Sequence, residues 1–304
     1  MPILKTFFED IGKITYHLEL ECLKHFPLSW SFRWLRIQGR VKYFIQGRRR
    51  KQSEHWMRRA LPKGATEQQV QQGAQEHFVF NELRLYLKYL VLAHDARKFQ
   101  YPIEVEGLER IDEALRRGNG VILLSSHVGL PRLLRWLFRS KDYRVLYLLK
   151  MMHPRNAKTI RDWLFFKLRA RFRLDDDDMA GNEELSVQYL KRAYDFLRQN
   201  GVVNIAGDGP VGDRRTDVII CSHKRSLPLG GLALGVMNDA VILPVFTVID
   251  TSPRFLIQIQ EPLVIPQEAN RSKQLDLLAA AYAERLENYV VEHPTNVYNM
   301  RHFP

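Results

Sequence analysis

Cysteine is scarce in this chain of 304 residues, and long apolar runs are absent from it. Cys22 and Cys221 are too few for a disulfide framework or a zinc site, which fits a protein of the reducing cytosol. The longest apolar stretch, 230–249, is interrupted by polar residues and by Pro244, so it does not reach the roughly 18 apolar residues of a spanning helix. Signal-peptide order, P-loop motifs and internal repeats are also missing. We therefore expect no spanning helix, no secretory leader and no metal or other cofactor.

Positive charge is in surplus, with 46 lysine and arginine residues against 34 aspartate and glutamate residues and a formal net charge of +12. Hydrophobic residues make up 45% of the chain and charged residues 26%, which is ordinary for a globular protein with a sizeable core. A surplus of this size indicates a polyanionic partner: a membrane surface, a nucleic acid or a phosphorylated substrate. No zinc finger, RNP signature or similar module is recognisable, so we expect no nucleic acid partner.

Residues 1–100 differ in pattern from the rest and are predicted to form a helical N-terminal segment. Apolar residues recur at helical spacing over 3–18, and a long helix is predicted over 67–93. Between them lie an aromatic stretch, 26–34, and a basic stretch, 36–59. The apolar stripe either docks on the protein core or, together with these aromatics and cations, lies at a membrane interface.

From residue 101 onward, helical patterns alternate with buried-strand patterns. This alternation predicts an α/β fold over residues 101–304: a mixed, mostly parallel sheet flanked by helices on both faces. The expected strands are 103–106, 121–125, 143–149, 202–206, 217–220, 241–249 and 254–260. The expected helices are 108–117, 131–139, 157–170, 183–199, 229–238 and 272–292, with a turn before the helix at 229.

The segment Gly120-Val-Ile-Leu-Leu-Ser-Ser-His127 places a histidine directly after one of the predicted buried strands. Pro131 suits the first turn of the following helix, where a missing N–H costs no hydrogen bond. His127 is therefore expected at the carboxyl end of a central strand, where open α/β sheets carry their chemistry. An exposed imidazole there can take a proton from a hydroxyl and return it to a leaving group. A purely structural histidine is the alternative interpretation.

The polar segment 204–215 also follows a predicted strand. Its glycines, Gly209 among them, let backbone N–H groups approach an anion, and Arg214 and Arg215 can pair with phosphate as planar forks. A turn-rich surface loop is the alternative interpretation of this segment.

Two other charged clusters lie between the predicted strands. Arg155 could face the same cleft as His127, whereas Arg169, Arg171 and Arg173 are most simply a solvated face. The four aspartates of 175–178 lack the spacing of a calcium-binding loop, which favours a mobile acidic loop over a cation site.

Taken in order, these pieces resemble the late acyltransferases of lipid A synthesis, the lauroyl and myristoyl transferases, within the lysophospholipid acyltransferase superfamily. The resemblance covers 100–304, with weaker similarity before it. The matching blocks are 120–129 with its histidine, His153 to Asn156 with Arg169 and Arg171, 200–208 ending in Asp208, 227–245, and the aromatic-basic tail 293–303.

This resemblance implies an acyltransferase that moves a fatty acyl group from an acyl-carrier-protein or coenzyme A thioester to a lipid, glycolipid or related acceptor. The family's histidine is a general base, which assigns that role to His127. The expected location is the cytoplasm, peripheral on the cytosolic face of the inner membrane, with an anionic membrane surface as a further partner. The residues expected to bind substrate or stabilise an oxyanion are Arg132, Arg155, Arg171, Gly129, Gly209 and Arg214.

The sequence departs from the family at Arg132, where the family has an aspartate or glutamate five residues after the histidine. A guanidinium accepts no hydrogen bond, and beside an imidazole it would lower the pKa of that imidazole. Three accounts remain open. Another carboxylate orients His127, with Asp208 the leading candidate because it ends the neighbouring predicted strand. Alternatively, His127 acts alone on a more nucleophilic acceptor such as an amine, or the chain binds lipid or acyl carrier without catalysis.

Overall fold

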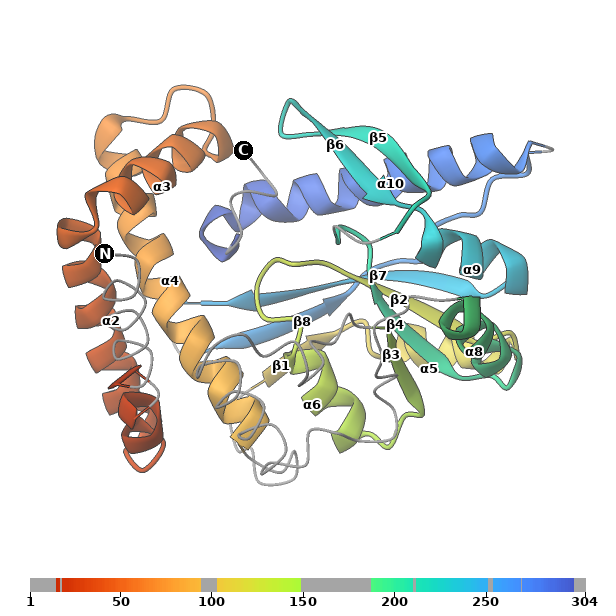
Figure 1. Cartoon of the computed structure of the whole chain (residues 1–304), viewed down its shortest axis with the longest axis horizontal. Coiled ribbons are helices and arrows are strands. Elements are labelled where there is room, and N and C mark those ends of the chain that lie inside the picture. Colours follow the sequence, from red (N-terminus) through yellow and green to blue (C-terminus); the bar gives the residue numbers. More distant parts are fainter. Residues whose placement is uncertain are drawn as a thin grey trace, which may run out of the picture.

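The structure is a computed structural model, and it describes residues 15–16, 18–93, 103–148, 187–209, 212–250, 254–268 and 270–297. Its centre is a six-stranded sheet in the order β1-β8-β7-β2-β4-β3 (Figure 1). The strands are β1 (Ile103–Glu106), β2 (Val121–Ser125), β3 (Val145–Leu148), β4 (Val202–Ala206), β7 (Val241–Ile249) and β8 (Phe255–Ile259). Among the described strands of this sheet, β7 and β8 pair antiparallel and the other neighbours pair parallel, so the mixed, mostly parallel sheet predicted from the sequence is confirmed.

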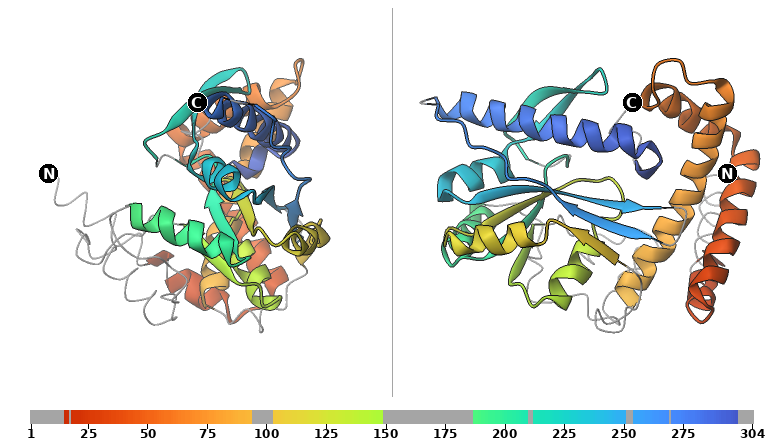
Figure 2. Two further views of the ribbon diagram at one scale, coloured as in Figure 1. Left: turned by 90° about the vertical axis from the view of Figure 1, so that its right-hand side faces the viewer. Right: turned by 180° about the vertical axis from the view of Figure 1, so that it is seen from behind.

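Helices cover both faces of this sheet, because its central strands are apolar on both sides. Along β2, Ile122 and Leu124 pack into one core cluster, whereas Val121 and Leu123 pack into the other. The first cluster is closed by α8 (Val187–Arg198), α9 (Gly230–Asn238) and α10 (Arg271–Glu292). The second is closed by α5 (Glu109–Arg116) and α6 (Leu133–Ser140), and α10 and α6 lie on opposite sides of the sheet in Figures 1 and 2.

The described part of the N-terminal segment includes the helices α2 (Leu28–Ile45), α3 (Gly47–Ala60) and α4 (Glu67–Ala93). They stand beside the tips of β7 and β8 (Figure 2). The ring of Phe32 meets that of Phe255 edge-on at 6.2 Å between centroids, so α2 reaches the core of the sheet domain. Within the residues that the structure describes, no helix combines the length and apolarity needed to cross a bilayer.

Two local elements differ from the sequence prediction. Residues 223–228, expected as part of a turn, form strand β6 (His223–Pro228), which pairs antiparallel with β5 (Arg215–Ile220) in a hairpin packed on α10. Helix α6 begins at Leu133 rather than at 131, and Arg132 is its N-cap residue. The predicted helix over 157–170 and the acidic run 175–178 lie outside the described residues.

Candidate active site

His127 lies in the loop between β2 and α6, at the carboxyl end of the sheet. The loop turns sharply at Gly129, whose φ of +63° lies in the left-handed region that favours glycine. A Cβ at this position would also collide with the carbonyl oxygen of Thr247. The Gly129 N–H donates to the Asn296 carbonyl oxygen at 2.8 Å, and the Leu130 N–H donates to Thr247 Oγ1 at 2.8 Å. The backbone beyond His127 is therefore fixed on two sides.

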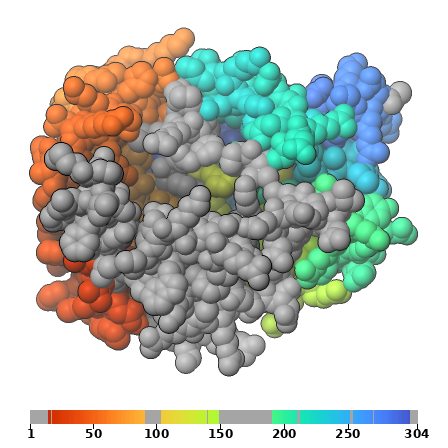
Figure 3. All heavy atoms as spheres, viewed as in Figure 1, coloured from red at the N-terminus to blue at the C-terminus, as the bar shows by residue number. Residues whose placement is uncertain are grey.

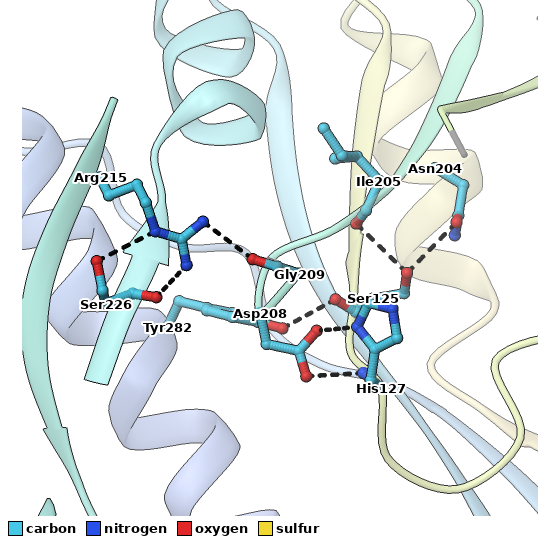
Figure 4. A network of polar contacts seen from close by, with 9 residues as sticks. All are labelled: Ser125, His127, Asn204, Ile205, Asp208, Gly209, Arg215, Ser226 and Tyr282. Carbon is cyan, nitrogen blue, oxygen red and sulfur yellow. Dashed lines mark hydrogen bonds and ion pairs between the residues drawn. The ribbon is translucent and has the colours of Figure 1, made fainter. Parts of the chain in front are cut away.

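Asp208 approaches His127 from the neighbouring strand. Strands β2 and β4 are parallel and in register, with Ser125 opposite Ala206, so the residues after each strand meet at one edge of the sheet. Asp208 accepts the His127 backbone N–H through Oδ2 at 2.7 Å, and its Oδ1 lies 2.8 Å from His127 Nδ1 (Figure 4). Because an ionised carboxylate only accepts hydrogen bonds, we assign the imidazole proton to Nδ1. The other ring nitrogen, Nε2, then carries the lone pair of a base.

Burial and charge tune this pair. The Asp208 side chain is 4% exposed, whereas that of His127 is 35% exposed. The hydrogen bond that His127 donates to Asp208, together with the negative charge of that carboxylate, raises the pKa of His127 above its ordinary value, against the opposing effect of burial. The imidazolium is therefore favoured at this position, which is what a base needs when it holds a proton during a reaction.

A second set of bonds braces the strand ends around this pair. The Ser125 carbonyl oxygen accepts from the Gly207 N–H at 2.7 Å and from the buried Tyr282 hydroxyl at 2.9 Å. Arg215 Nη1 donates to the Gly209 carbonyl oxygen at 3.1 Å, while the rest of its guanidinium is bonded to Ser226 on β6 (Figure 4). The hairpin thus holds the chain that follows Asp208.

Gly209 lies directly beside the imidazole, since a Cβ there would be 3.5 Å from His127 Cε1. Within the described part of the chain, the Gly209 N–H donates no backbone hydrogen bond, whereas the Gly129 N–H is bonded to the Asn296 carbonyl oxygen. Gly209 is therefore the better placed of these two glycines to stabilise negative charge beside the imidazole. The β2–α6 segment reaches the surface in a hollow between the N-terminal helices and the β5–β6 hairpin (Figure 3).

The other residues predicted to bind substrate lie in different surroundings or outside the described residues. Arg132 is half-buried at the start of α6. A guanidinium that dominated the surroundings of His127 would lower the pKa of the imidazole, whereas this pKa is raised. Arg214 is exposed, with its carbonyl oxygen bonded to the Leu229 N–H at 3.0 Å. Arg155 and Arg171 lie outside the described residues. Over the described ranges, no three histidine, cysteine or acidic side chains are grouped to hold a metal ion.

Sequence reasoning did not identify four residues that brace the site: Thr247, Tyr282, Arg215 as a brace, and Asn296. Tyr282 and Thr247 sit in apolar patterns that predict core residues. Asn296 belongs to the tail noted for its resemblance to the family, but nothing in the local sequence indicates that its carbonyl reaches Gly129.

A protein-family model matches most of the chain. A model of the family described as "Bacterial lipid A biosynthesis acyltransferase" matches residues 14–302, well beyond the stretch over which the resemblance was strongest. No curated protein sequence matches significantly. Among solved structures, the crystal structure of the 1-acyl-sn-glycerophosphate (LPA) acyltransferase PlsC from Thermotoga maritima is similar with a TM-score of 0.35 and 14% sequence identity, covering 86% of this chain and 94% of that chain. An overlap this weak adds nothing to the fold and site described above.

Proposed function

The chain belongs to the family of bacterial lipid A biosynthesis acyltransferases, and on this premise we propose that it transfers a fatty acyl group from a thioester to a hydroxyl of a lipid or glycolipid, with His127 as general base. The donor is an acyl-carrier-protein or coenzyme A thioester. The observation that carries the proposal is the pair of bonds by which Asp208 holds His127 at the strand ends.

The proposed chemistry uses each ring nitrogen of His127 differently. Nε2 removes the proton of the acceptor hydroxyl while the hydroxyl oxygen attacks the thioester carbonyl, which gives a tetrahedral intermediate. Collapse of the intermediate breaks the carbon–sulfur bond, and the leaving thiolate takes the proton from Nε2. Nδ1 remains bonded to Asp208 throughout, so the carboxylate fixes the tautomer and stabilises the transient imidazolium.

The negative charge of the intermediate needs a donor. We assign it to the Gly209 N–H, which lies beside the imidazole, with Arg155 as a further candidate. Arg132, Arg171 and Arg214 are proposed to hold phosphate, either of the lipid acceptor or of the donor's phosphopantetheine arm.

We further propose that the protein works as a peripheral protein on the cytosolic face of the inner membrane. Helix α2 carries a stripe of exposed apolar side chains at helical spacing, and we call it the α2 stripe: Trp30, Trp34, Ile37, Val41, Phe44 and Ile45. Arg33, Arg40, Arg48 and Arg49 are exposed on the same helix or at the start of α3. Aromatic side chains beside cations suit the boundary of an anionic bilayer.

The central test is acyl transfer from thioesters of acyl carrier protein or coenzyme A to lipid extracts. His127→Ala should reduce product formation by at least about 10³-fold, because general-base catalysis and nucleophile activation are lost together. His55→Ala, which removes an exposed histidine from α3, is the matched control and should retain wild-type activity. Equal activity of the wild type and His127→Ala would show that His127 is not the general base.

One observation supports a second candidate function. Arg132 occupies the place of the family's carboxylate, so the same fold could bind lipid or acyl carrier without turnover. Arg132→Glu separates the two readings. With Asp208 as the working partner the variant gains no activity, whereas a gain from an inactive wild type would mean that catalysis had been lost at this position.

A further inference from the structure

The segment 294–297 near the end of the described chain lies between the N-terminal helices and the His127 loop. It consists of the short helix η3 (Pro294–Asn296) and the fully buried Val297, and we call it the C-terminal strap. Two buried side chains of the N-terminal helices hold it: Trp56 Nε1 donates to the Pro294 carbonyl oxygen at 2.8 Å, and His77 Nε2 lies 2.8 Å from the Val297 carbonyl oxygen. The strap is therefore tied to α3 and α4.

Asn296 connects the strap to the sheet. Its side chain pairs with both main-chain groups of Ile249 at the end of β7: Oδ1 accepts the N–H at 2.8 Å, and Nδ2 donates to the carbonyl oxygen at 3.2 Å. The residue is 3% exposed. Two antiparallel bonds to one residue fix both the distance and the rotation of the strap relative to β7, and a buried amide has no water to replace them.

The strap then contacts the His127 loop through the main chain. The Asn296 carbonyl oxygen accepts the Gly129 N–H at 2.8 Å, two residues beyond His127. Gly129 is also pressed against the Thr247 carbonyl, on the same strand as Ile249. The position of the loop is thus set between β7 and the strap, and Asn296 bonds both to β7 and to the loop.

From this geometry we propose that Asn296 is a positioning residue for His127: by clamping the strap to β7, it places the loop so that Nδ1 meets Asp208 and Nε2 faces the acceptor. This inference rests on the proposed role of His127. Asn296 itself touches neither the imidazole nor the reacting atoms, so its effect must pass through the loop.

The test is Asn296→Ala in the whole 304-residue chain, measured in two ways. Steady-state acyl transfer should show kcat reduced by about 10–100-fold with KM within about 3-fold, because a misplacement of about 1 Å costs rate rather than binding. Titration of His127 by NMR, on protein with isotopically labelled histidine, should show its pKa moving down from the raised wild-type position toward its ordinary value, because the contact with Asp208 loosens.

Asn200→Gly is the matched control. The Asn200 side chain also makes two hydrogen bonds to the main chain, but at the opposite end of β2: it accepts from the Gly120 N–H and donates to the Leu115 carbonyl oxygen. Glycine tolerates the φ of +58° at this position. This variant should lower the melting temperature yet leave kcat and the His127 titration unchanged. A folded Asn296→Ala protein with wild-type kcat and titration, or an equal loss of kcat in Asn200→Gly, would overturn the proposal.

A milder variant covers the case in which Asn296→Ala does not fold. Trp56→Phe removes the bond to Pro294 while keeping an aromatic ring in the core, and it should reduce kcat by about 2–5-fold with a smaller fall in the His127 pKa; no effect on either would count against the strap. Because the titration needs no turnover, it tests the placement of His127 even if His127→Ala shows that His127 is not the base.

Discussion

At the residue scale, the hydrogen bond to Asp208 and the charge of that carboxylate set the pH at which His127 can act. A raised pKa means that the imidazole is neutral, and able to accept a proton, only above that pKa. Activity should therefore be lost as pH falls through an apparent pKa above 6.5, and present above it. Asp208→Asn should lower this apparent pKa and reduce the plateau rate by about 10²–10⁴-fold, since the neutral amide no longer stabilises the imidazolium. Profiles of kcat/KM against pH for both proteins provide the measurement; an unchanged apparent pKa in the variant would exclude Asp208 as the partner.

Gly129 gives a second prediction at this scale. Alanine there meets two obstacles, a left-handed backbone and the rigid Thr247 carbonyl, so the loop must move and carry His127 with it. Gly129→Ala should lower kcat by at least about 10²-fold. Gly230→Ala, where an added methyl meets nothing within 4 Å, should be nearly neutral. Comparable losses in the two variants would contradict the steric argument.

The two residues of the His127–Asp208 pair could be placed from the sequence because parallel strands bring their carboxyl ends to one edge. His127 follows one apolar run and Asp208 another, and the parallel register of β2 and β4 brings the two residues together. Asn296 and Thr247 could not be found in this way. Their contacts with Gly129 and Leu130 join segments more than a hundred residues apart, and on the loop side they involve main-chain N–H groups, which leave no pattern of residue types.

At the scale of elements, His77 links α3 and α4 to the C-terminal strap. Its Nδ1 lies 2.9 Å from Ser53 Oγ and its Nε2 lies 2.8 Å from the Val297 carbonyl, and burial lowers its pKa to about 4. The unfolded chain takes up this proton near pH 6.5 and the folded chain near pH 4. The free energy of unfolding should therefore fall by about 3 kcal/mol between pH 7 and pH 4 from this residue alone.

Denaturant unfolding across this pH range checks the prediction. His77→Gln should be less stable than the wild type at pH 7 but should lose about 3 kcal/mol less on acidification, because it has no proton to take up. His55→Gln, on the exposed side of α3, should keep the wild-type slope. Parallel slopes for the wild type and His77→Gln would mean that His77 does not resist protonation.

Elements with strong periodicity were predictable and those defined by tertiary contacts were not. The buried strands β2, β4 and β7 follow directly from apolar runs bounded by glycine or polar residues. Strand β6 has a basic, mixed sequence, HKRSLP, and is a strand because it pairs with β5 over α10. Helix α6 begins two residues later than expected, because the chain is still turning at Pro131 after the bonds that fix Gly129 and Leu130.

At the scale of the whole molecule, net charge and the α2 stripe act on the same partner. A charge of +12 attracts the protein to any polyanion, but exposed Trp30, Trp34 and Phe44, at 66%, 51% and 66%, gain free energy only from a surface with an apolar interior. We therefore expect binding to anionic phospholipid vesicles that weakens with salt but persists better than binding to DNA at equal ionic strength.

The double variant Trp30→Ser/Trp34→Ser isolates the apolar part of this binding. It leaves the charge unchanged and should weaken vesicle affinity by at least about tenfold, since each side chain contributes about 1 kcal/mol on partial burial. Ile219→Ser/Val264→Ser removes two exposed apolar side chains elsewhere, one on the β5–β6 hairpin and one after β8, and should leave affinity unchanged. Vesicle co-sedimentation measures both. If the two double variants lose affinity equally, binding is spread over the surface; if only the first loses affinity, α2 faces the bilayer.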